Sequence, residues 1–443
     1  MQCVAQLIAP WREPVEVLSA FADEPWALAL LSGGGRWSYL ARAPDATLTI
    51  SGEDPRDPFA ALAELLGCAS PGLPDGPPFQ GGVVGLAAYE LADRVEALGL
   101  PRQDAWPDLA AARYGALLAF DHQQRAVVAV GRGEDEIAAE FAARAALGWL
   151  DAPARPPAGQ ALAIGLQASD PDAYEAAVAQ VVGRIHAGEI FQANIARAWT
   201  GELVQGARPF DLFARLAAQS AAPMAAYLRL PGLALVSNSP ERFVQVRDGQ
   251  ALTQPIKGTR PRGATPAQDA ALAAELSASE KDRAENLMIV DLMRNDLARV
   301  CAPGTVKVPA LWALESFANV HHLVSTVTGR LAPGATAVDL LRATFPPGSI
   351  TGAPKVQAMK VIASLETPRG PYCGSLFWAG FDGGFDSSVL IRTAACVETA
   401  DGWRLEARAG AGIVADSDPH AERLETEAKI AAIVRALTQE PAA

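Results

Sequence analysis

Cysteine is scarce in this 443-residue chain, and its placement argues against two common uses of the residue. The five cysteines are odd in number, lie far apart and form no Cys-x-x-Cys pair. They are Cys3, Cys68, Cys301, Cys373 and Cys396. A disulfide framework and a cysteine-based zinc site are therefore not indicated, and we expect reduced thiols in a cytoplasmic protein.

Basic residues are also outnumbered. The chain has 37 lysines and arginines against 50 aspartates and glutamates, which gives a formal net charge of −13. This excess of negative charge argues against nucleic acid or an anionic membrane surface as the main partner, because both are polyanions. A small dianionic substrate would need local positive charge or a bound metal ion.

Long apolar runs are missing as well. No segment reaches the roughly 18 uncharged apolar residues of a membrane helix, and residues 1–10 lack the basic start and apolar stretch of a signal peptide. Half of the residues are nevertheless hydrophobic, which is enough for a sizeable core. We expect a globular protein that is neither exported nor inserted in a membrane.

A proline-rich stretch at residues 151–159, Asp-Ala-Pro-Ala-Arg-Pro-Pro-Ala-Gly, is the best candidate for a domain boundary. Several prolines in a short segment favour an extended surface connection. We therefore divide the chain into an N-terminal domain at residues 1–150, a connection at 151–160 and a C-terminal domain at 161–443.

Two groups of short alternating strands predict antiparallel meanders in the second domain. The strands are expected at residues 225–230, 233–237, 242–247 and 251–256, and again at 374–381, 387–397 and 403–408. Helices are expected at 58–66, 134–150, 265–277, 280–297 and 353–365, and after the caps Asp170 and Asp418, each followed by proline. Strands grouped in meanders with separate helices indicate an α+β fold.

Lys257 is unusual because it lies at the end of an apolar strand, between Pro255 and Gly258. Burial disfavours an ammonium ion, and the neutral amine that results is a nucleophile or a base. Gly258 allows a positive φ or a close approach of the backbone to a ligand, and Thr259 adds a hydroxyl group. On spacing alone, a lysine that reaches solvent or forms a structural ion pair is the commoner alternative.

Acidic side chains recur on two of the predicted helices. Residues 277–280, Ser-Ala-Ser-Glu, resemble a capping box at the start of the helix that carries Glu285. The last helix places Glu422, Glu425 and Lys429 on one stripe. Carboxylates three residues apart can share Mg²⁺, which keeps waters for a substrate oxygen. A solvated charged helix face explains the same pattern.

Three polar side chains in turn or strand positions have two explanations each. Glu241 lies at a turn one strand before Lys257, and it either projects beside that lysine or forms a surface pair with Arg242. Arg392 lies in a predicted apolar strand, where it faces either an internal ion-pair partner or a carboxylate ligand. His322 is either a packed core histidine or a functional group.

Two further stretches offer backbone N–H groups to an anion. Residues 410–412, Gly-Ala-Gly, permit a ligand close to the backbone, and residues 347–355 open a predicted helix. The second stretch could equally be an ordinary capped helix start. Residues 33–35, Gly-Gly-Gly, predict a turn, because the lysine and helix of a phosphate-binding loop do not follow.

Residues 255–259, Pro-Ile-Lys-Gly-Thr, resemble the signature of the chorismate-utilising enzymes, in the form found in the aminodeoxychorismate synthase component I group. The anthranilate synthases carry alanine at the position of Lys257. Other stretches resemble the same family in the same order over nearly the whole chain, most strongly from about residue 172 to 432. The resemblance implies an anthranilate synthase component I-like fold, with two antiparallel sheets packed as a sandwich and helices on the outside.

The resemblance also implies catalytic roles. Lys257 would bond to C2 of chorismate, Glu241 would act as general acid and base at the C4 hydroxyl group, and His322 would orient that hydroxyl as it leaves. Ammonia would then add at C4 to give 4-amino-4-deoxychorismate, a step in 4-aminobenzoate and folate synthesis. If Lys257 has this role, the variant Lys257→Ala should form no covalent adduct with chorismate.

Substrate and metal contacts are implied in the same way. Glu285 and Glu425 would hold Mg²⁺ against the ring carboxylate of chorismate, with Glu422 nearby. The substrate-binding set would be Gly258, Thr259, Tyr372, Arg392, Gly410, Ala411, Gly412 and Lys429. Arg392 would contact the enolpyruvyl carboxylate.

Two other functions remain open. Gln192 stands where the isochorismate and salicylate synthases have a lysine base, and Asn194 is similar to the aminodeoxychorismate pattern, but anthranilate synthase component I differs by only a few side chains. The second alternative is a non-catalytic, tryptophan-binding regulatory subunit, with a site formed by Ser32 and residues 223–225. Residues 30–33 lack the glutamate of the feedback-inhibited enzymes, which argues against feedback control.

The source of ammonia is expected to be another protein. No nucleophilic cysteine with a paired histidine marks a glutaminase, and the chain ends soon after the last predicted helix, so we expect no fused glutaminase or lyase. The resemblance implies that a separate glutamine amidotransferase subunit supplies ammonia to the chorismate site.

Overall fold

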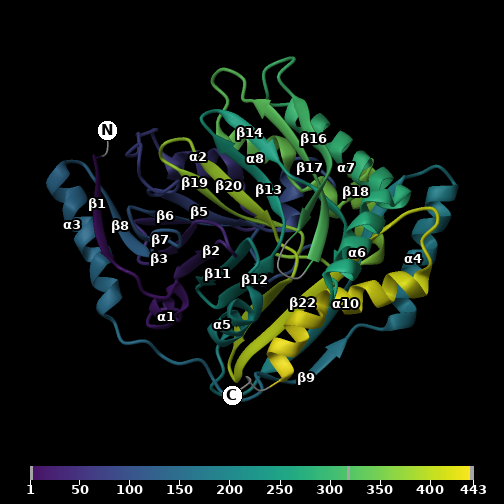
Figure 1. Ribbon diagram of the computed structural model, residues 1–443, viewed down its shortest axis with the longest axis horizontal. Helices are drawn as coiled ribbons and strands as arrows, with labels where there is room; N and C mark the ends of the chain where they lie inside the picture. The colour runs from purple at the N-terminus through teal and green to yellow at the C-terminus, as the bar shows by residue number, and fades with distance from the viewer. Residues whose placement is uncertain (1–2, 317–319, 440–443) are drawn as a thin grey trace.

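Two large antiparallel sheets form the centre of the computed structural model, which describes residues 3–316 and 320–439 (Figure 1). The 12 strands of the first sheet are, in spatial order, β1 (Cys3–Pro10), β8 (Ala126–Gly133), β7 (Ala116–Asp121), β3 (Trp37–Ala41), β2 (Leu28–Leu31), β11 (Met224–Leu230), β12 (Leu233–Ser239), β21 (Thr393–Thr399), β22 (Gly402–Ile413), β10 (Gln192–Leu203) and β18 (Gly352–Ala353), with β9 (Ala163–Ala168) paired to β10.

The second sheet has 10 strands and contains Lys257, the lysine of the Pro-Ile-Lys-Gly-Thr stretch. In spatial order they are β15 (Ile256–Pro261), β17 (Val320–Arg330), β14 (Gln250–Thr253), β13 (Arg242–Arg247), β20 (Phe385–Val389), β19 (Ser375–Gly380), β5 (Gly82–Ala87), β6 (Leu109–Tyr114) and β4 (Ala46–Ile50), with β16 (Lys307–Ser316) paired to β17. The predicted meander at residues 225–256 therefore divides between the sheets, because the chain crosses from β12 to β13 at Glu241.

An apolar layer joins the two sheets face to face. It includes Tyr39 and Leu235 from the first sheet and Leu86 and Trp378 from the second, all buried. The alternation of side chains along each strand directs every second residue into this layer. The predicted sandwich of two antiparallel sheets is thus what the structure shows.

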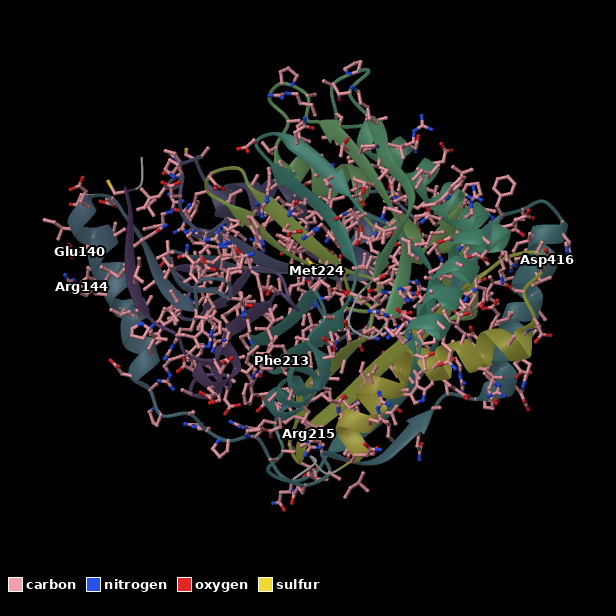
Figure 2. All side chains as sticks on the ribbon, viewed as in Figure 1. Glu140, Arg144, Phe213, Arg215, Met224 and Asp416 are labelled. Atoms are coloured by element: carbon pink, nitrogen blue, oxygen red, sulfur yellow. The ribbon has the colours of Figure 1, made fainter. Side chains whose placement is uncertain are left out.

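The helices cover the outer faces of the sandwich (Figure 1). They are α1 (Pro14–Ser19), α2 (Pro58–Leu66), α3 (Glu136–Leu147), α4 (Pro171–His186), α5 (Pro209–Ser220), α6 (Pro266–Ala278), α7 (Glu280–Ala298), α8 (Ala337–Thr344), α9 (Lys355–Leu365) and α10 (Pro419–Thr438), with 3-10 turns η1 (Tyr89–Arg94), η2 (Gly148–Asp151) and η3 (Gly348–Ile350). Helices α5 and α10 pack on the first sheet, and α2, α7 and α8 on the second. Figure 2 shows Arg215 of α5 beside the end of α10, where it donates hydrogen bonds to two carbonyl groups, Ala436 O at 3.0 Å and Gln439 O at 2.8 Å.

Helix starts predicted from aspartate and proline are confirmed. Asp170 and Asp418 each accept a hydrogen bond from the first turn of their helices, and proline occupies the first position in both. The capping box predicted at residues 277–280 is wrong in one respect. Ser279 is the cap of α7, whereas the hydroxyl group of Ser277 bonds to a carbonyl group inside α6.

The proline-rich connection at residues 151–160 does not separate the sheets. Strands from both sides of it pair directly, as β2 with β11 in the first sheet and β5 with β19 in the second. The division of the sequence into two domains stays a prediction, and the two parts share one apolar layer. Among the described residues, no helix is long and apolar enough to cross a membrane.

Candidate active site

A cavity of about 650 Å³ opens where the ends of β15 and β22 meet α7 and α10. Its lining contains all but one of the residues predicted to act in catalysis, metal binding or substrate binding. They are Glu241, Lys257, Gly258, Thr259, Glu285, His322, Tyr372, Arg392, Gly410, Gly412, Glu425 and Lys429, with Glu422 beside them. The exception is Ala411, which packs in an apolar cluster because its side chain points to the opposite face of β22 from Gly410 and Gly412.

Lys257 is half-buried on β15, and its amine lies against the backbone of β22. A Cβ atom at Gly412 would be 3.2 Å from Lys257 Nζ and 2.4 Å from Gln192 Nε2, so only glycine leaves this space open. Gly258 has φ +81°, in the left-handed region that glycine adopts without strain. These two glycines place the lysine amine inside the cavity.

Glu241 is buried in the same cavity, with 6% of its surface exposed. Its Oε1 accepts a hydrogen bond of 2.6 Å from the Ser349 hydroxyl group. Burial raises the pKa of Glu241 to about 7, against the opposing effects of the Ser349 bond and the positive charges of Lys257 and Lys429. The alternative surface pair with Arg242 is wrong, because Arg242 instead pairs with Asp386 at 2.8 Å.

His322, on β17, faces the cavity beside Thr259. The two side chains hydrogen-bond through His322 Nδ1 and Thr259 Oγ1 at 2.9 Å. Burial, assisted by the positive charge of Arg392, lowers the pKa of His322 to about 4, so the ring is neutral at physiological pH. The adjacent His321 points elsewhere and bonds to Asp269 at 2.9 Å.

Arg392 occupies a different backbone setting from the one predicted. It lies between β20 and β21 rather than inside a strand, with φ +53°. Burial lowers the pKa of its guanidinium group. No carboxylate among the described residues forms an ion pair with Arg392, which leaves its donors available to an anionic ligand.

Carboxylates from two helices face each other across the cavity. Burial raises the pKa of Glu285 on α7, and the negative charge of Glu425 on α10 adds to the effect. For Glu425, burial would raise the pKa, but Lys429, which is 2.6 Å away, together with Lys257 and Lys281 lowers it below its usual value. Glu422 accepts a hydrogen bond of 2.7 Å from Ser417.

The carboxylates of Glu285 and Glu425 suit a hard cation that also binds waters or substrate oxygens. No group of three or more His, Cys, Asp or Glu in the described part of the chain is arranged to hold a metal ion. Mg²⁺, however, commonly takes one or two carboxylates together with waters and substrate oxygens. Glu285 and Glu425 repel each other through their charges, and a divalent cation between them would relieve that repulsion.

Two further residues that line the cavity, Ser349 and Asn194, and Gln192 beside it had no role predicted from their own chemistry. Ser349 reaches Glu241 from η3, which falls within residues 347–355, where the sequence predicted only backbone donors. Asn194 and Gln192 are buried, and Asn194 Oδ1 and Gln192 Oε1 have no hydrogen-bond partner among the described residues. Only the polarity of Asn194 and Gln192 within an apolar strand could have indicated such positions.

The lining of a second cavity, of about 880 Å³, includes Arg242 and Arg247 of β13. Its lining includes Ser32 and residues 223–225, the site predicted for the tryptophan-binding alternative, together with Trp378. Figure 2 shows Met224, one of the lining residues, near the middle of the molecule.

Comparisons with known proteins agree with this geometry. The family model described as chorismate binding enzyme matches residues 27–435. Aminodeoxychorismate synthase component 1 of Klebsiella aerogenes is 40% identical over 98% of this chain and 99% of its own length. Anthranilate synthase component 1 of Streptomyces coelicolor is 40% identical over 93% of this chain and 83% of its own length.

A solved structure supports the same assignment. The crystal structure of anthranilate synthase component I from Streptococcus pneumoniae superposes with a TM-score of 0.81 and 29% identity, covering 91% of this chain and 93% of that chain. The predicted anthranilate synthase component I-like fold and the predicted family resemblance are both confirmed. From its sequence, its fold and the residues that line its first cavity, the chain belongs to the chorismate binding enzyme family.

Proposed function

We propose that this chain is an aminodeoxychorismate synthase component I, which converts chorismate and ammonia to 4-amino-4-deoxychorismate. One observation carries the proposal: the amine of Lys257 and the carboxyl group of Glu241 face one cavity, and the pKa of Glu241, about 7, allows the carboxyl group to give and take protons near neutral pH. The relatives named aminodeoxychorismate synthase component 1 from three bacteria, at 38% to 40% identity, support the same function.

In the first half of the reaction the unprotonated amine of Lys257 adds to C2 of the ring. The ring double bond shifts, and the C4 oxygen leaves as water with a proton from Glu241. His322, which is neutral and held by Thr259, orients the departing hydroxyl group. Covalent catalysis replaces one difficult displacement at C4 by two easier allylic steps.

In the second half ammonia adds at C4, the double bond shifts back and the bond from C2 to Lys257 breaks. The Glu241 carboxylate takes up the proton that the new ammonium group releases. Arg392 and Lys429 contribute positive charge for the two carboxylates of chorismate, and Gly258 and Gly412 line the same cavity.

Glu285 and Glu425 are the residues that would hold Mg²⁺. The ion, when bound, supplies positive charge that draws electron density from the ring through its carboxylate. The carboxylates of α7 and α10 also define the wall against which the ring carboxylate would lie.

We infer that ammonia reaches this site from a separate glutamine amidotransferase. The relatives are named as component 1, a name that implies a second component. Cys373 and Cys396, two of the three buried cysteines, have pKa values raised to about 12 by burial, so neither is a reactive thiolate at neutral pH.

The alternative is anthranilate synthase component I. Relatives with that name share up to 40% identity with this chain, and the solved structure described above carries it too. Lys257 favours amination without loss of pyruvate, because the anthranilate synthases resembled here carry alanine at this position. A tryptophan-binding regulatory subunit is the second alternative, supported by the second cavity.

Product analysis tests the proposal directly. The purified chain is incubated with chorismate, Mg²⁺ and an ammonium salt, and the products are separated and identified by mass. Aminodeoxychorismate without pyruvate is the expected result. Anthranilate with pyruvate would instead assign the chain to the first alternative, and tryptophan binding without turnover to the second.

A further inference from the structure

Ser349 supplies the hydrogen bond that the Glu241 carboxyl group receives inside the cavity. Ser349 Oγ is 2.6 Å from Glu241 Oε1, and the two residues are 8% and 6% exposed. No other described residue donates a hydrogen bond to either carboxyl oxygen. Glu241 Oε2 is therefore the oxygen that remains for a ligand in the cavity.

The backbone around Ser349 is held from both sides. Arg369 is buried, and its guanidinium group donates to the carbonyl group of Ile350 at 3.2 Å and to that of Asn194 at 2.7 Å. A Cβ atom at Gly348 would be 2.7 Å from Met293 Cε on α7, so the turn also packs closely on that helix. Ser349 thus projects from a fixed turn between β10 and α7.

The backbone of Glu241 is fixed as well. Its carbonyl group accepts a hydrogen bond of 3.0 Å from Val389 N, and its N–H group donates to Ser239 Oγ at 3.3 Å. What remains is rotation within the Glu241 side chain, and among the described residues the bond from Ser349 is the hydrogen bond that restricts it.

We propose that Ser349 is a positioning residue, which fixes the side-chain conformation of Glu241 so that Oε2 faces the C4 oxygen of the substrate. The proposal rests on the proposed function only in assigning Glu241 the proton transfer. Ser349 itself touches no reacting atom in this scheme. Its contribution is to hold the acid in the reactive geometry, which enzymes commonly achieve with a supporting hydrogen bond.

The hydrogen bond from Ser349 also lowers the pKa of Glu241 relative to burial alone. Three effects oppose the burial that raises the pKa of Glu241, and the Ser349 bond is the largest, followed by the charges of Lys257 on β15 and Lys429 on α10. A hydroxyl group that donates to a carboxylate favours its ionised form. Removing the hydroxyl therefore moves the pKa of Glu241 to a higher value.

The experiment compares Ser349→Ala, Ser349→Thr and the wild type in pH profiles of kcat and kcat/KM for chorismate. For Ser349→Ala we expect kcat to fall about 10- to 100-fold, the size of a lost hydrogen bond to a charged group, with KM within about 3-fold. The part of the pH–rate profile that is set by ionisation of Glu241 should move to higher pH. Ser349→Thr, which keeps the hydroxyl group, should recover most of the rate.

Ser387→Ala is the matched control. Ser387 is fully buried and bonds to Val244 O at 2.7 Å, but it does not contact the Glu241 carboxyl group. It should lower the melting temperature without moving the pH profile. An unmoved profile in Ser349→Ala, or a rate loss of the same size when Glu241→Gln is already present, would overturn the positioning role.

The outcome is separable from that of the proposed function. If the wild type makes anthranilate, the proposed function fails, yet the same carboxyl group still removes the C4 oxygen and the profiles remain decisive. If the wild type turns over neither product, infrared difference spectra against Glu241→Gln report the carboxyl group directly. An upward shift of its titration in Ser349→Ala supports the inference, and no shift overturns it.

Discussion

The two cavities differ in how their charged side chains are partnered. In the first, Lys429 pairs with Glu425 at 2.6 Å, whereas Lys257, Glu241 and Arg392 form no ion pair among the described residues. In the second, Arg36 pairs with Asp121 at 2.7 Å and Arg242 with Asp386 at 2.8 Å. Ionisable groups that are buried without neutralising partners are costly, and they persist where chemistry needs them.

Neighbouring residues contribute to the two cavities. Glu241, which lies between β12 and β13, lines the first cavity, and Arg242, the first residue of β13, lines the second. The contrast suggests that the first cavity transforms a ligand and the second at most binds one. Five substitutions test this contrast.

Lys257→Ala should have the largest effect. Loss of the nucleophile should lower the rate of amination by about three orders of magnitude or more and abolish any covalent adduct with chorismate. Intact-protein mass after rapid quenching detects the adduct. Lys360→Ala, at an exposed lysine of α9, is the control. A variant without Lys257 that aminates chorismate at the wild-type rate would refute the role.

Glu241→Gln should lower kcat about 100- to 10,000-fold, the usual contribution of a positioned acid and base.

Glu241 also links the stability of the folded protein to pH. Burial raises the pKa of Glu241 from 4.5 to about 7, so the folded state holds an extra proton between these values. The resulting stability is fully present below pH 4.5 and is lost as the pH rises through about 7.

This linkage is measurable as a difference between proteins. The free energy of unfolding of the wild type relative to Glu241→Gln should decrease by up to about 3 kcal/mol between pH 4.5 and pH 8, from denaturant titrations at each pH. An increase over the same range would mean that Glu241 is ionised in the folded protein at low pH, contrary to the burial described here.

Glu285→Gln and Glu425→Gln should act through the metal. Each removes one carboxylate, so the Mg²⁺ concentration at half-maximal rate should rise at least about 10-fold, and EDTA should inactivate the wild type. Glu280→Gln changes an exposed glutamate on the same helix as Glu285 and serves as control. Isothermal titration with Mg²⁺ alone gives a reading that does not depend on activity; equal affinities in variant and wild type would contradict the assignment.

Met224→Ala should have the smallest effect on turnover. It enlarges the second cavity, so kcat/KM for chorismate should stay within about 2-fold of the wild-type value. If tryptophan occupies this cavity, its dissociation constant should rise in the variant. A loss of activity comparable to that of Glu241→Gln would show that the two cavities do not act separately.

Local signals in the sequence predicted much of this structure. Proline at the first helical position after an aspartate located the starts of α4 and α10, because the cap and the fixed φ act within a few residues. The antiparallel sheets and the identity of the residues lining the first cavity were also predicted, the latter through family resemblance rather than through spacing.

What the sequence did not predict depends on residues distant in the chain. The predicted strand around Arg392 breaks because the chain changes from one sheet to the other between Val389 and Thr393. The contact between Ser349 and Glu241 joins residues 108 positions apart. A periodic sequence pattern does not predict contacts between such distant residues. For the same reason, the sequence did not predict that strands pair across the proline-rich connection.

The position of α10 has a consequence for biosynthesis. This helix and its neighbour β22 leave the ribosome after all the other described strands and helices, and β22 must pair with β10, more than 200 residues earlier, to complete the first sheet. Glu422, Glu425 and Lys429 all come from α10, so one wall of the first cavity is absent until α10 has been synthesised. A nascent or prematurely terminated chain can therefore form much of the sandwich without acquiring a reactive site.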